Sequence, residues 1–555
     1  MTLTVPAAFE AADISYQALS PMIVLLVGAF VGVLVEAFAP RSTRHLAQVV
    51  LSVATIVIAF VALVITGDSA GVTVGGTVAV DDPTRFMQGA LLVLGLLGLL
   101  VMADRLGGDT ADAFTPMGAA SPGSALESQA ARKGWSTTEV FPLALFALAG
   151  MLLFPAANDL LTMFVALELL SLPLYLMSGL ARRRRLLSQE AALKYFLLGA
   201  FSSGFFLFGA ALLYGYAGSI DLARIAAAAS TSTGDLEGLL LPGVVMVLVG
   251  LLFKVGAVPF HSWTPDVYQG APTPVTGFMA ACTKAAAFGA LLRLIYVGLE
   301  TTRWEWRMGV VVIAALTMVI GAVLSVTQTD IKRLLAYSSI AHAGFILVGL
   351  ISFDRTAVEG VLFYVVAYGI TTIAAFAVVN LVRERGAEAT HLSQWAGLGR
   401  AHPYIAGTFA LFMLAFAGIP LTSGFTAKVA AFIPAVEHGG LSGVLLVVIG
   451  VLMSAVTAFV YIRLIVLMFF TEPGGEVTVA APATLSLVVI GIGEVPQGDS
   501  NDRHLMVELV KGGERVDHST LDDARDRHAA SRAELPAKAL QMSRGEAVIP
   551  TIFEG

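Results

Sequence analysis

Six ionisable side chains lie inside long apolar stretches of the chain, where lipid or protein rather than water is expected to surround them. A charged side chain at the centre of a bilayer costs about 3 kcal/mol or more, so such residues usually serve a function. The set comprises one carboxylate, four amines and one imidazole: Glu168, Lys194, Lys254, Lys284, His342 and Lys428.

Simpler explanations apply to some of these residues more than to others. Lys194 follows soon after the basic run 182–185, and a lysine near a helix end can extend its ammonium to the headgroup layer. His342 could be a hydrogen-bonded packing residue. Lys254 and Glu168 lie well inside their stretches and do not reach water easily. Structural or interfacial roles are favoured for Arg293 and Arg463.

The chemistry of the set suits proton transfer. Desolvation disfavours the charged form of an amine, and a nearby carboxylate favours it. A pair such as Lys254 and Glu168, whose separation or hydration varies, can therefore load and release a proton near neutral pH. Further lysines, a histidine and internal water would extend such a pair into a path. No metal site is expected, because lysine is a poor ligand and the histidines are scattered without ligand spacing.

Two of the apolar stretches are interrupted. The first interruption follows Lys254 and reads FKVGAVPFHSWTPDVYQGAPTP, and the second reads AGIPLTSGF at 417–425. Proline removes a backbone donor and kinks a helix, so Pro259 and Pro420 predict broken helices. Non-helical backbone at membrane depth is tolerated where it is buried in protein or lines a wet cavity. His261 and Asp266, beside the first break, are candidates for the mouth of such a cavity.

Composition predicts the elements that hold these residues. The 555 residues are 57% hydrophobic and 13% charged, whereas about a quarter of a soluble domain is charged. Repeated apolar runs indicate an all-α polytopic membrane protein with about fourteen transmembrane helices. Interrupted helices in corresponding halves predict two inverted five-helix repeats. The apolar segments fall at 20–39, 46–66, 86–103, 139–156, 159–180, 190–216, 239–262, 267–280, 281–298, 308–328, 334–351, 358–381, 403–436, 441–470 and 479–493. The two segments 239–262 and 267–280 are interpreted as the halves of one broken helix.

These segments divide the chain into five parts. We expect an N-terminal three-helix segment with a polar loop, a first repeat, a second repeat, a curtailed last helix and a soluble charged tail, at 1–138, 139–298, 308–470, 479–493 and 494–555. The tail is atypical of the rest of the chain, and the short last apolar run leaves open whether that helix spans the membrane.

Basic residues are concentrated in alternate loops. By the positive-inside rule this pattern predicts a multi-pass protein of the bacterial plasma membrane with its N-terminus outside. The run RRRR at 182–185 is interpreted as part of this topology signal rather than as a nucleic-acid site. The single Cys282 argues against a disulfide framework or an iron–sulfur site. No Gly-rich phosphate loop follows a strand pattern, so no nucleotide site is expected.

Four motifs carry a family resemblance. They are FKVGAVPFHSWTPDVYQGAPTPVTGFMAACTKAAAFGALLRL, ELLSLPLYLMSGL, TDIKRLLAYSSIAHAGFILVGL and GIPLTSGFTAK. Together they closely resemble the antiporter-like membrane subunits of respiratory complex I. Two features are most similar to the subunit N family of bacterial NADH–quinone oxidoreductase. They are the sequence PDVYQGAP and a lysine rather than a glutamate at position 428. The resemblance covers about residues 1–480 and is strongest over 155–430.

The resemblance implies a proton-translocating subunit of a larger complex, driven by quinone reduction elsewhere. It implies that Glu168 and Lys254 form a coupled pair, that Lys194 lies beside the input route, and that Lys284 and His342 continue a central polar axis to Lys428. FMN, iron–sulfur clusters and quinone would belong to other subunits, and the partners would be the other membrane subunits and the lipid bilayer.

Two other functions remain open at this stage. Subunits of multisubunit sodium/proton antiporters share these motifs, and a purely structural membrane spacer is a third interpretation. The tail departs from the family, and its last part faintly resembles the C-terminal end of nicotinate phosphoribosyltransferases. So short a fragment is not expected to carry that catalysis, and a gene fusion or frameshift explains it best.

Overall fold

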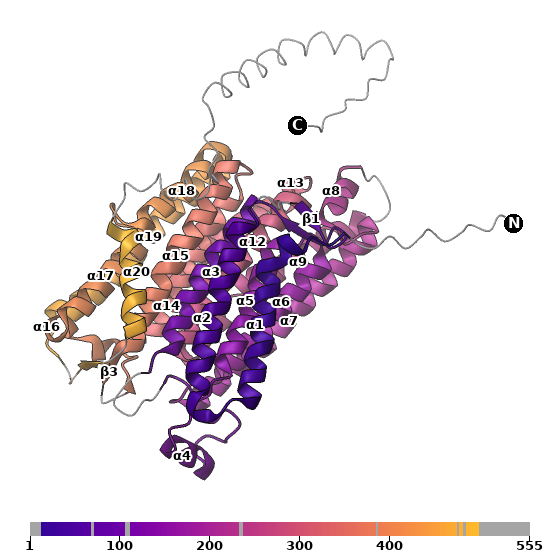
Figure 1. Ribbon diagram of the computed structural model, residues 1–555. Coiled ribbons are helices and arrows are strands. Elements are labelled where there is room, and N and C mark those ends of the chain that lie inside the picture. The colour runs from indigo at the N-terminus through magenta and orange to yellow at the C-terminus, as the bar shows by residue number, and fades with distance from the viewer. Residues whose placement is uncertain are drawn as a thin grey trace, which may run out of the picture. The chain divides into compact units, whose positions relative to one another are not determined.

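A computed structural model of the protein describes residues 13–67, 71–105, 112–231, 237–384, 387–473, 475, 477–480 and 484–498. Within these ranges, eleven helices are long and apolar enough to cross a membrane, and three shorter apolar helices accompany them. Together they make up the fourteen that the sequence predicts. The chain is therefore an all-α polytopic membrane protein, as expected (Figure 1).

The long helices follow the apolar segments in chain order. They are α1 Tyr16–Phe38, α2 Arg41–Ile65, α3 Asp82–Ala103, α5 Val140–Leu153, α6 Leu160–Ser178, α7 Arg185–Ala217, α9 Leu240–Val255, α12 Lys284–Arg293, α13 Arg303–Val326, α14 Ile331–Leu350, α15 Arg355–Leu381, α17 Pro403–Ala417, α18 Ser423–His438, α19 Gly440–Phe470 and α20 Thr484–Gly498. Short helices connect them: α4 Ala125–Arg132, α8 Leu222–Thr231, α10 Trp263–Gly270, α11 Thr273–Phe278, α16 Leu398–Ala401 and the single turns η1 Phe154–Ala156, η2 Glu237–Leu239 and η5 Leu392–Trp395.

Two small antiparallel sheets lie among the connections. The strands β1 Gly71–Thr73 and β2 Val78–Val80 form a hairpin. The strands β3 Val382–Glu384, β4 Ala387–Glu388 and β5 Val477–Val479 form a sheet of order β4-β3-β5. The pairing of β3 with β5 joins the end of α15 to the segment that precedes α20.

One continuous helix replaces two of the apolar segments inferred from the sequence. The segmentation placed a boundary between 280 and 281, but residues Thr273–Gly298 form a single span. It runs from α11 through the π-helical turn η3 Met279–Thr283 and α12 to the π-helical turn η4 Leu294–Gly298. The boundary was wrong because no proline or glycine interrupts the chain at that point, whereas Pro272 and Pro274 open the helix. The second half of the broken helix is therefore only α10.

Both interruptions begin where a glycine ends a helix in the left-handed conformation. Gly256, with φ of 75°, ends α9, and Gly418, with φ of 78°, ends α17. Glycine adopts this conformation without steric cost and closes helix C-termini for that reason. Pro259 lies between α9 and α10, and Pro420 lies between α17 and α18. Each break leaves backbone carbonyls at the end of a half-helix in the protein interior.

A repeated local arrangement relates the two halves of the chain. Asp159 caps α6 and pairs across an isolated antiparallel bridge with Asp221, just before α8. Asp330 caps α14 in the same way and pairs with His391, just after β4. Figure 1 shows α8 and β3 at opposite ends of the helical bundle. Two repeats that run through the membrane in opposite directions would place such equivalent Asp caps and bridges at opposite ends of the bundle.

Three spans form the centre of the bundle. The spans Thr273–Gly298, α14 and α15 are 94%, 89% and 89% buried, whereas α19 is 28% buried and α2 is 33% buried. Apolar helix faces left open by the protein would meet lipid or neighbouring subunits. The three central spans are therefore the ones best shielded from the bilayer.

The last helix is anchored at its N-terminus. Asp104, at the end of α3, accepts hydrogen bonds from the backbone N–H groups of Leu485 at 3.3 Å and Ser486 at 2.6 Å. A carboxylate there satisfies free donors and complements the positive end of the helix. Thr408 on α17 also donates to Glu494 at 2.6 Å. The charged tail predicted from 494 onward lies outside the described residues from 499.

Candidate functional site

Lys254 occupies the last turn of α9, immediately before the first break. Its side chain is buried, and its Nζ lies 5.3 Å from the ring centroid of Tyr175 and 5.1 Å from that of Tyr195. These are cation–π distances. The C-terminal end of a helix also favours a positive charge. Two aromatic faces and a helix end thus hold the ammonium without a direct ionic bond.

Glu168 acts on this ammonium from α6 without touching it. The Glu168 carboxylate influences Lys254 through its electric field. Neither Lys254 Nζ nor Glu168 Oε1 has a hydrogen-bond partner among the described residues. Buried polar atoms are nearly always hydrogen-bonded, to protein or to ordered water. The geometry therefore suits a water-bridged pair better than a closed salt bridge.

Lys284 begins α12 and reaches the first break from the other side. Its Nζ donates to the backbone carbonyls of Ser339 at 2.7 Å and Val255 at 3.2 Å. Val255 is the last residue of α9 and the direct neighbour of Lys254. The carbonyl exposed by the helix break is thus satisfied by a second buried lysine. Lys284 Nζ also lies 5.8 Å from the ring of Tyr368.

His342 lies between the two breaks, in the middle of α14. Its Nδ1 is hydrogen-bonded to the Tyr364 hydroxyl at 2.9 Å, and its Nε2 has no partner among the described residues. Its ring centroid is 4.9 Å from that of Tyr368 and 5.5 Å from that of Phe416. An imidazole with one nitrogen bonded and the other free can accept or donate a proton on the free side.

Lys428 reaches the second break from α18. Its Nζ donates to the backbone carbonyls of Ala417 at 2.8 Å and Phe416 at 3.2 Å, at the C-terminal end of α17. It also lies 4.8 Å from the ring of Phe345. Lys428 at the second break and Lys284 at the first therefore share one arrangement, a buried ammonium that satisfies the carbonyls at the end of a half-helix.

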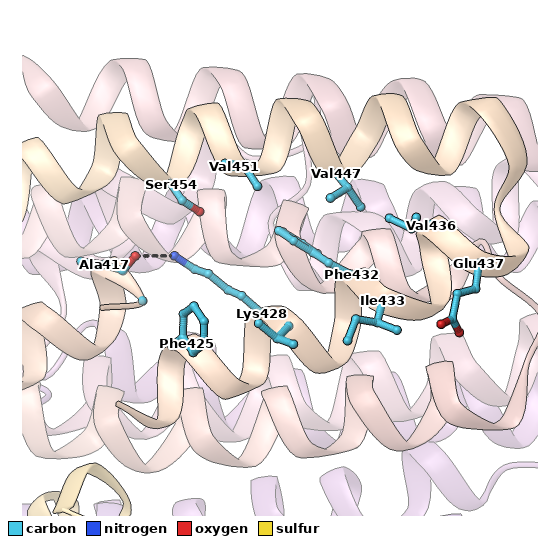
Figure 2. Close-up of a pocket in the computed structure, with 12 residues that line it drawn as sticks. Ala417, Phe425, Lys428, Phe432, Ile433, Val436, Glu437, Val447, Val451 and Ser454 are labelled. Atoms are coloured by element: carbon cyan, nitrogen blue, oxygen red, sulfur yellow. Dashed lines mark hydrogen bonds between the residues drawn. The ribbon is translucent and has the colours of Figure 1, made fainter. Parts of the chain in front are cut away.

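A mostly apolar pocket of about 490 Å³ surrounds the Lys428 side chain. It lies between α18 and α19, and Figure 2 shows Lys428 extending along it toward Ala417. The Ser454 hydroxyl lies near the ammonium end, and Glu437 lies at the far end. The pocket leaves room for small polar molecules beside an ammonium that uses two of its three donors on protein.

A continuous series of contacts links the two breaks. Lys284 lies over the ring of Tyr368, that ring lies against His342, and His342 lies against Phe416. The carbonyl of Phe416 then accepts a hydrogen bond from Lys428. Together with the bond of Lys284 to Val255, beside Lys254, these ring contacts and backbone hydrogen bonds connect the buried amines and the imidazole in one series. This series, here called the axis, runs through the most buried spans of the described residues.

Lys194 differs from the other lysines because it lies at the protein surface. It pairs with Glu190 and Asp266, each at 2.8 Å, and its side chain is 42% exposed. Asp266 also binds Arg333, with 2.6 Å between Oδ1 and Nη1. Two of the residues selected from the sequence thus meet in one ionic cluster. His261 is half-buried in the first break.

The sequence analysis missed the tyrosines of the axis and one buried lysine. Tyr364 and Tyr368 follow each other by one turn of α15 and face His342, a spacing that the sequence shows. Lys332 precedes the apolar segment 334–351 and is not among the residues selected from the sequence, but its side chain is fully buried. Its Nζ donates to the Ala271 carbonyl, which follows α10, at 2.6 Å.

Arg293, for which the sequence favours a structural or interfacial role, is bonded to two other elements. Its guanidinium contacts the Asp81 carboxylate at 2.6 Å and the Pro155 carbonyl at 2.7 Å. The guanidinium stays protonated in proteins, so Arg293 does not release a proton. These bonds tie the end of α12 to the start of α3 and to η1.

No group of three or more His, Cys, Asp or Glu residues gathers as a metal site within the described ranges. The amines of the axis face backbone carbonyls and aromatic rings. Such an arrangement can exchange protons between neighbouring groups and water.

Comparisons with known proteins place this chain in a family. The family model described as "NADH:quinone oxidoreductase/Mrp antiporter, TM" matches residues 157–457. The NADH-quinone oxidoreductase subunit N of Rhodococcus opacus is 55% identical over 509 residues, which cover 88% of this chain and 94% of that relative. This chain belongs to the subunit N family of NADH-quinone oxidoreductase. Subunit N 3 of Streptomyces griseus is 54% identical and covers 87% of this chain and 91% of its own length.

Solved structures agree with membership of the subunit N family. A chain of respiratory complex I from Thermus thermophilus matches with a TM-score of 0.68 and 32% identity, covering 86% of this chain and 96% of that one. A chain of the Mrp complex from Dietzia sp. matches with a TM-score of 0.72 but 19% identity, covering 90% and 96%. The likeness to the Mrp chain shows a shared fold alone. The family assignment therefore favours complex I over the antiporter alternative.

Proposed function

We propose that this chain is a proton-translocating membrane subunit of NADH–quinone oxidoreductase, and that protons pass along the buried axis from Glu168 to Lys428. The observation that carries the proposal is the unbroken series of contacts from Lys284 through Tyr368 and His342 to Lys428. Charged groups at membrane depth are costly unless they serve a path of this kind.

Each residue has a distinct part in the proposed path. Glu168 and Lys254 load the proton, because a change in their separation or hydration shifts the balance between charged and neutral amine. Lys284 and His342 relay it along the central spans. Lys428 passes it to the exit or to the next subunit. Lys194, with Asp266, lies beside the input, and His261 lines the mouth at the break.

The driving reaction takes place elsewhere in the complex. FMN, the iron–sulfur clusters and quinone belong to other subunits, and this chain performs no redox chemistry itself. Its activity is that of a translocase within the NADH–quinone oxidoreductase. Its partners are the other membrane subunits and the surrounding bilayer, and it binds no nucleic acid.

The proposed topology places the N-terminus outside the bacterial plasma membrane. Support comes from the distribution of arginines and lysines among alternate loops. The proposed organisation keeps 1–138 as an N-terminal three-helix segment, 139–298 and 308–470 as inverted repeats, and 479–493 within the last helix. The tail expected from 494 onward begins later, because residues 494–498 are the end of α20.

Replacing Glu168 by glutamine tests the proposal. Glutamine keeps the size of the side chain but removes the charge that acts on Lys254, so NADH-driven proton uptake should fall at least about tenfold. The measurement is proton uptake by inverted membrane vesicles, alongside NADH oxidation, with and without sodium. Glu237→Gln, an exposed change outside the axis, is the control and should pump normally.

Three outcomes separate the alternatives. Normal proton uptake in an assembled Glu168→Gln complex would contradict the proposed path. Uptake that requires sodium would favour a sodium/proton antiporter. Loss of assembly in Glu168→Gln, with no coupling defect in the complexes that do form, would favour a structural spacer.

A further inference from the structure

The short helix α10 lies beside Lys254, and its Asp266 and Gln269 side chains are partly exposed. It follows the first break and packs against α7 on one side and α14 on the other. Its first residue is Trp263 and its last is Gly270. Its position is set by buried contacts with α7 and α14 and by polar bonds at Asp266 and near its two ends.

Trp263 closes the space around Lys254. Its indole stacks on Tyr195 with ring centroids 4.6 Å apart and an interplanar angle of 7°. Tyr195 is one of the two rings that face the Lys254 ammonium. The indole N–H also donates to the Phe253 carbonyl at 2.9 Å, next to Lys254 in the chain. The first turn of α10 is therefore part of the wall that buries Lys254.

Asp266 holds α10 in this position through two cations from different helices. Its Oδ1 binds Arg333 of α14 at 2.6 Å, and its Oδ2 binds Lys194 of α7 at 2.8 Å. Arg333 also donates to Gln269 at 3.1 Å. The three charged side chains are 29% to 42% exposed. They lie at the protein surface, at the outer side of α10.

Lys332 fixes the other end of the helix. Its buried ammonium donates to the carbonyl of Ala271, which follows α10. If the bonds at Asp266 were released, the C-terminal end would stay anchored on α14. The Trp263 end would then lose its charged anchor and keep the indole stack, the hydrogen bond to Phe253 and the burial of its first turn. Release at Asp266 would therefore move the part of α10 that covers Lys254.

We propose that α10 is a latched cover over Lys254, and that Arg333 is the positioning residue whose bond to Asp266 keeps the cover closed. Opening admits water from the surface cluster of Lys194 and Asp266 to the Lys254 ammonium. This inference rests on the proposed function and adds the route by which the proton enters.

A single buried thiol on the cover tests the proposal. Thr264 is 1% exposed and lies in the first turn of α10 against Gly256, so Thr264→Cys places a reporter that becomes accessible when α10 moves away from the break. The parent carries Thr264→Cys with Cys282→Ala in the assembled complex. The rate of alkylation of this subunit by N-ethylmaleimide is followed by mass spectrometry. Adding Arg333→Gln should raise that rate at least about tenfold, because a local opening becomes more populated.

Matched variants give the expected order. Asp266→Asn weakens the bonds to both Lys194 and Arg333, so its thiol should be alkylated at least as fast as that of Arg333→Gln. Arg333→Lys retains the cation and should react close to the parent rate. Arg355→Gln removes an exposed pair with Glu359 elsewhere in the chain and should leave the rate unchanged.

Equal alkylation rates for the parent, Arg333→Gln and Asp266→Asn would contradict the proposal that the bond of Arg333 to Asp266 keeps α10 closed over Lys254. The result is independent of pumping. If these rates differ as expected while Glu168→Gln pumps normally, the cover stands and the proposed function fails. If Glu168→Gln stops pumping while the rates are equal, the function stands and the cover fails.

Discussion

The Lys254→Met complex should assemble normally and lose NADH-driven proton uptake by about a hundredfold or more, the scale of a lost proton-transfer group. Methionine has nearly the length of lysine and is apolar. Lys254 Nζ makes no hydrogen bond within the described residues. Removing it therefore leaves no described hydrogen-bond partner on the protein unpaired, and the charged group that loses an interaction is the partly buried Glu168 carboxylate, whose opposite charge is removed.

The control for Lys254→Met is the same substitution at an exposed lysine. Lys133 lies at the surface beside Trp135, away from the axis. Lys133→Met should leave proton uptake and complex stability unchanged. Unimpaired uptake in Lys254→Met would contradict a proton-transfer role. A large fall in the melting temperature of Lys254→Met would show instead that the ammonium is structural.

Lys428 should respond differently, because its ammonium satisfies backbone carbonyls. In Lys428→Met the carbonyls of Phe416 and Ala417 lose their donor at the end of α17. Leaving such buried acceptors unpaired costs about 1–3 kcal/mol. This variant should therefore lose both proton uptake and thermal stability.

Lys428→Arg separates the two losses. Arginine can still donate to both carbonyls, and the adjoining pocket of about 490 Å³ offers space for the guanidinium. It remains charged at all relevant pH values and cannot release a proton. The melting temperature should return toward that of the parent while proton uptake stays abolished. Recovery of pumping in Lys428→Arg would mean that position 428 supplies only a fixed charge.

The sequence predicted the membrane class and the buried lysines for one physical reason. Hydropathy reports local preference for lipid, and a lysine within an apolar run stands out in any such pattern. Both breaks also followed from local chemistry, since proline and glycine act on their own neighbourhood. The subunit N family followed from the motifs around these residues.

What the sequence did not predict depends on contacts between distant segments. Lys332 resembles any loop cation until α10 is placed beside it. Tyr368 joins Lys284 to His342 only once α12, α14 and α15 are packed together. The boundary near 280 failed because a π-helical turn continues the helix and leaves no signal in composition.

Ordered water within the axis tests the central claim most directly. The measurement is a high-resolution electron cryo-microscopy map of the whole complex. Because buried polar atoms are nearly always hydrogen-bonded, water should lie about 2.7–3.2 Å from Glu168 Oε1, Lys254 Nζ and His342 Nε2. Density for such waters, continuing toward Lys428, is the predicted result. A dry axis sealed by apolar side chains between Lys254 and Lys428, both at rest and during turnover, would contradict it.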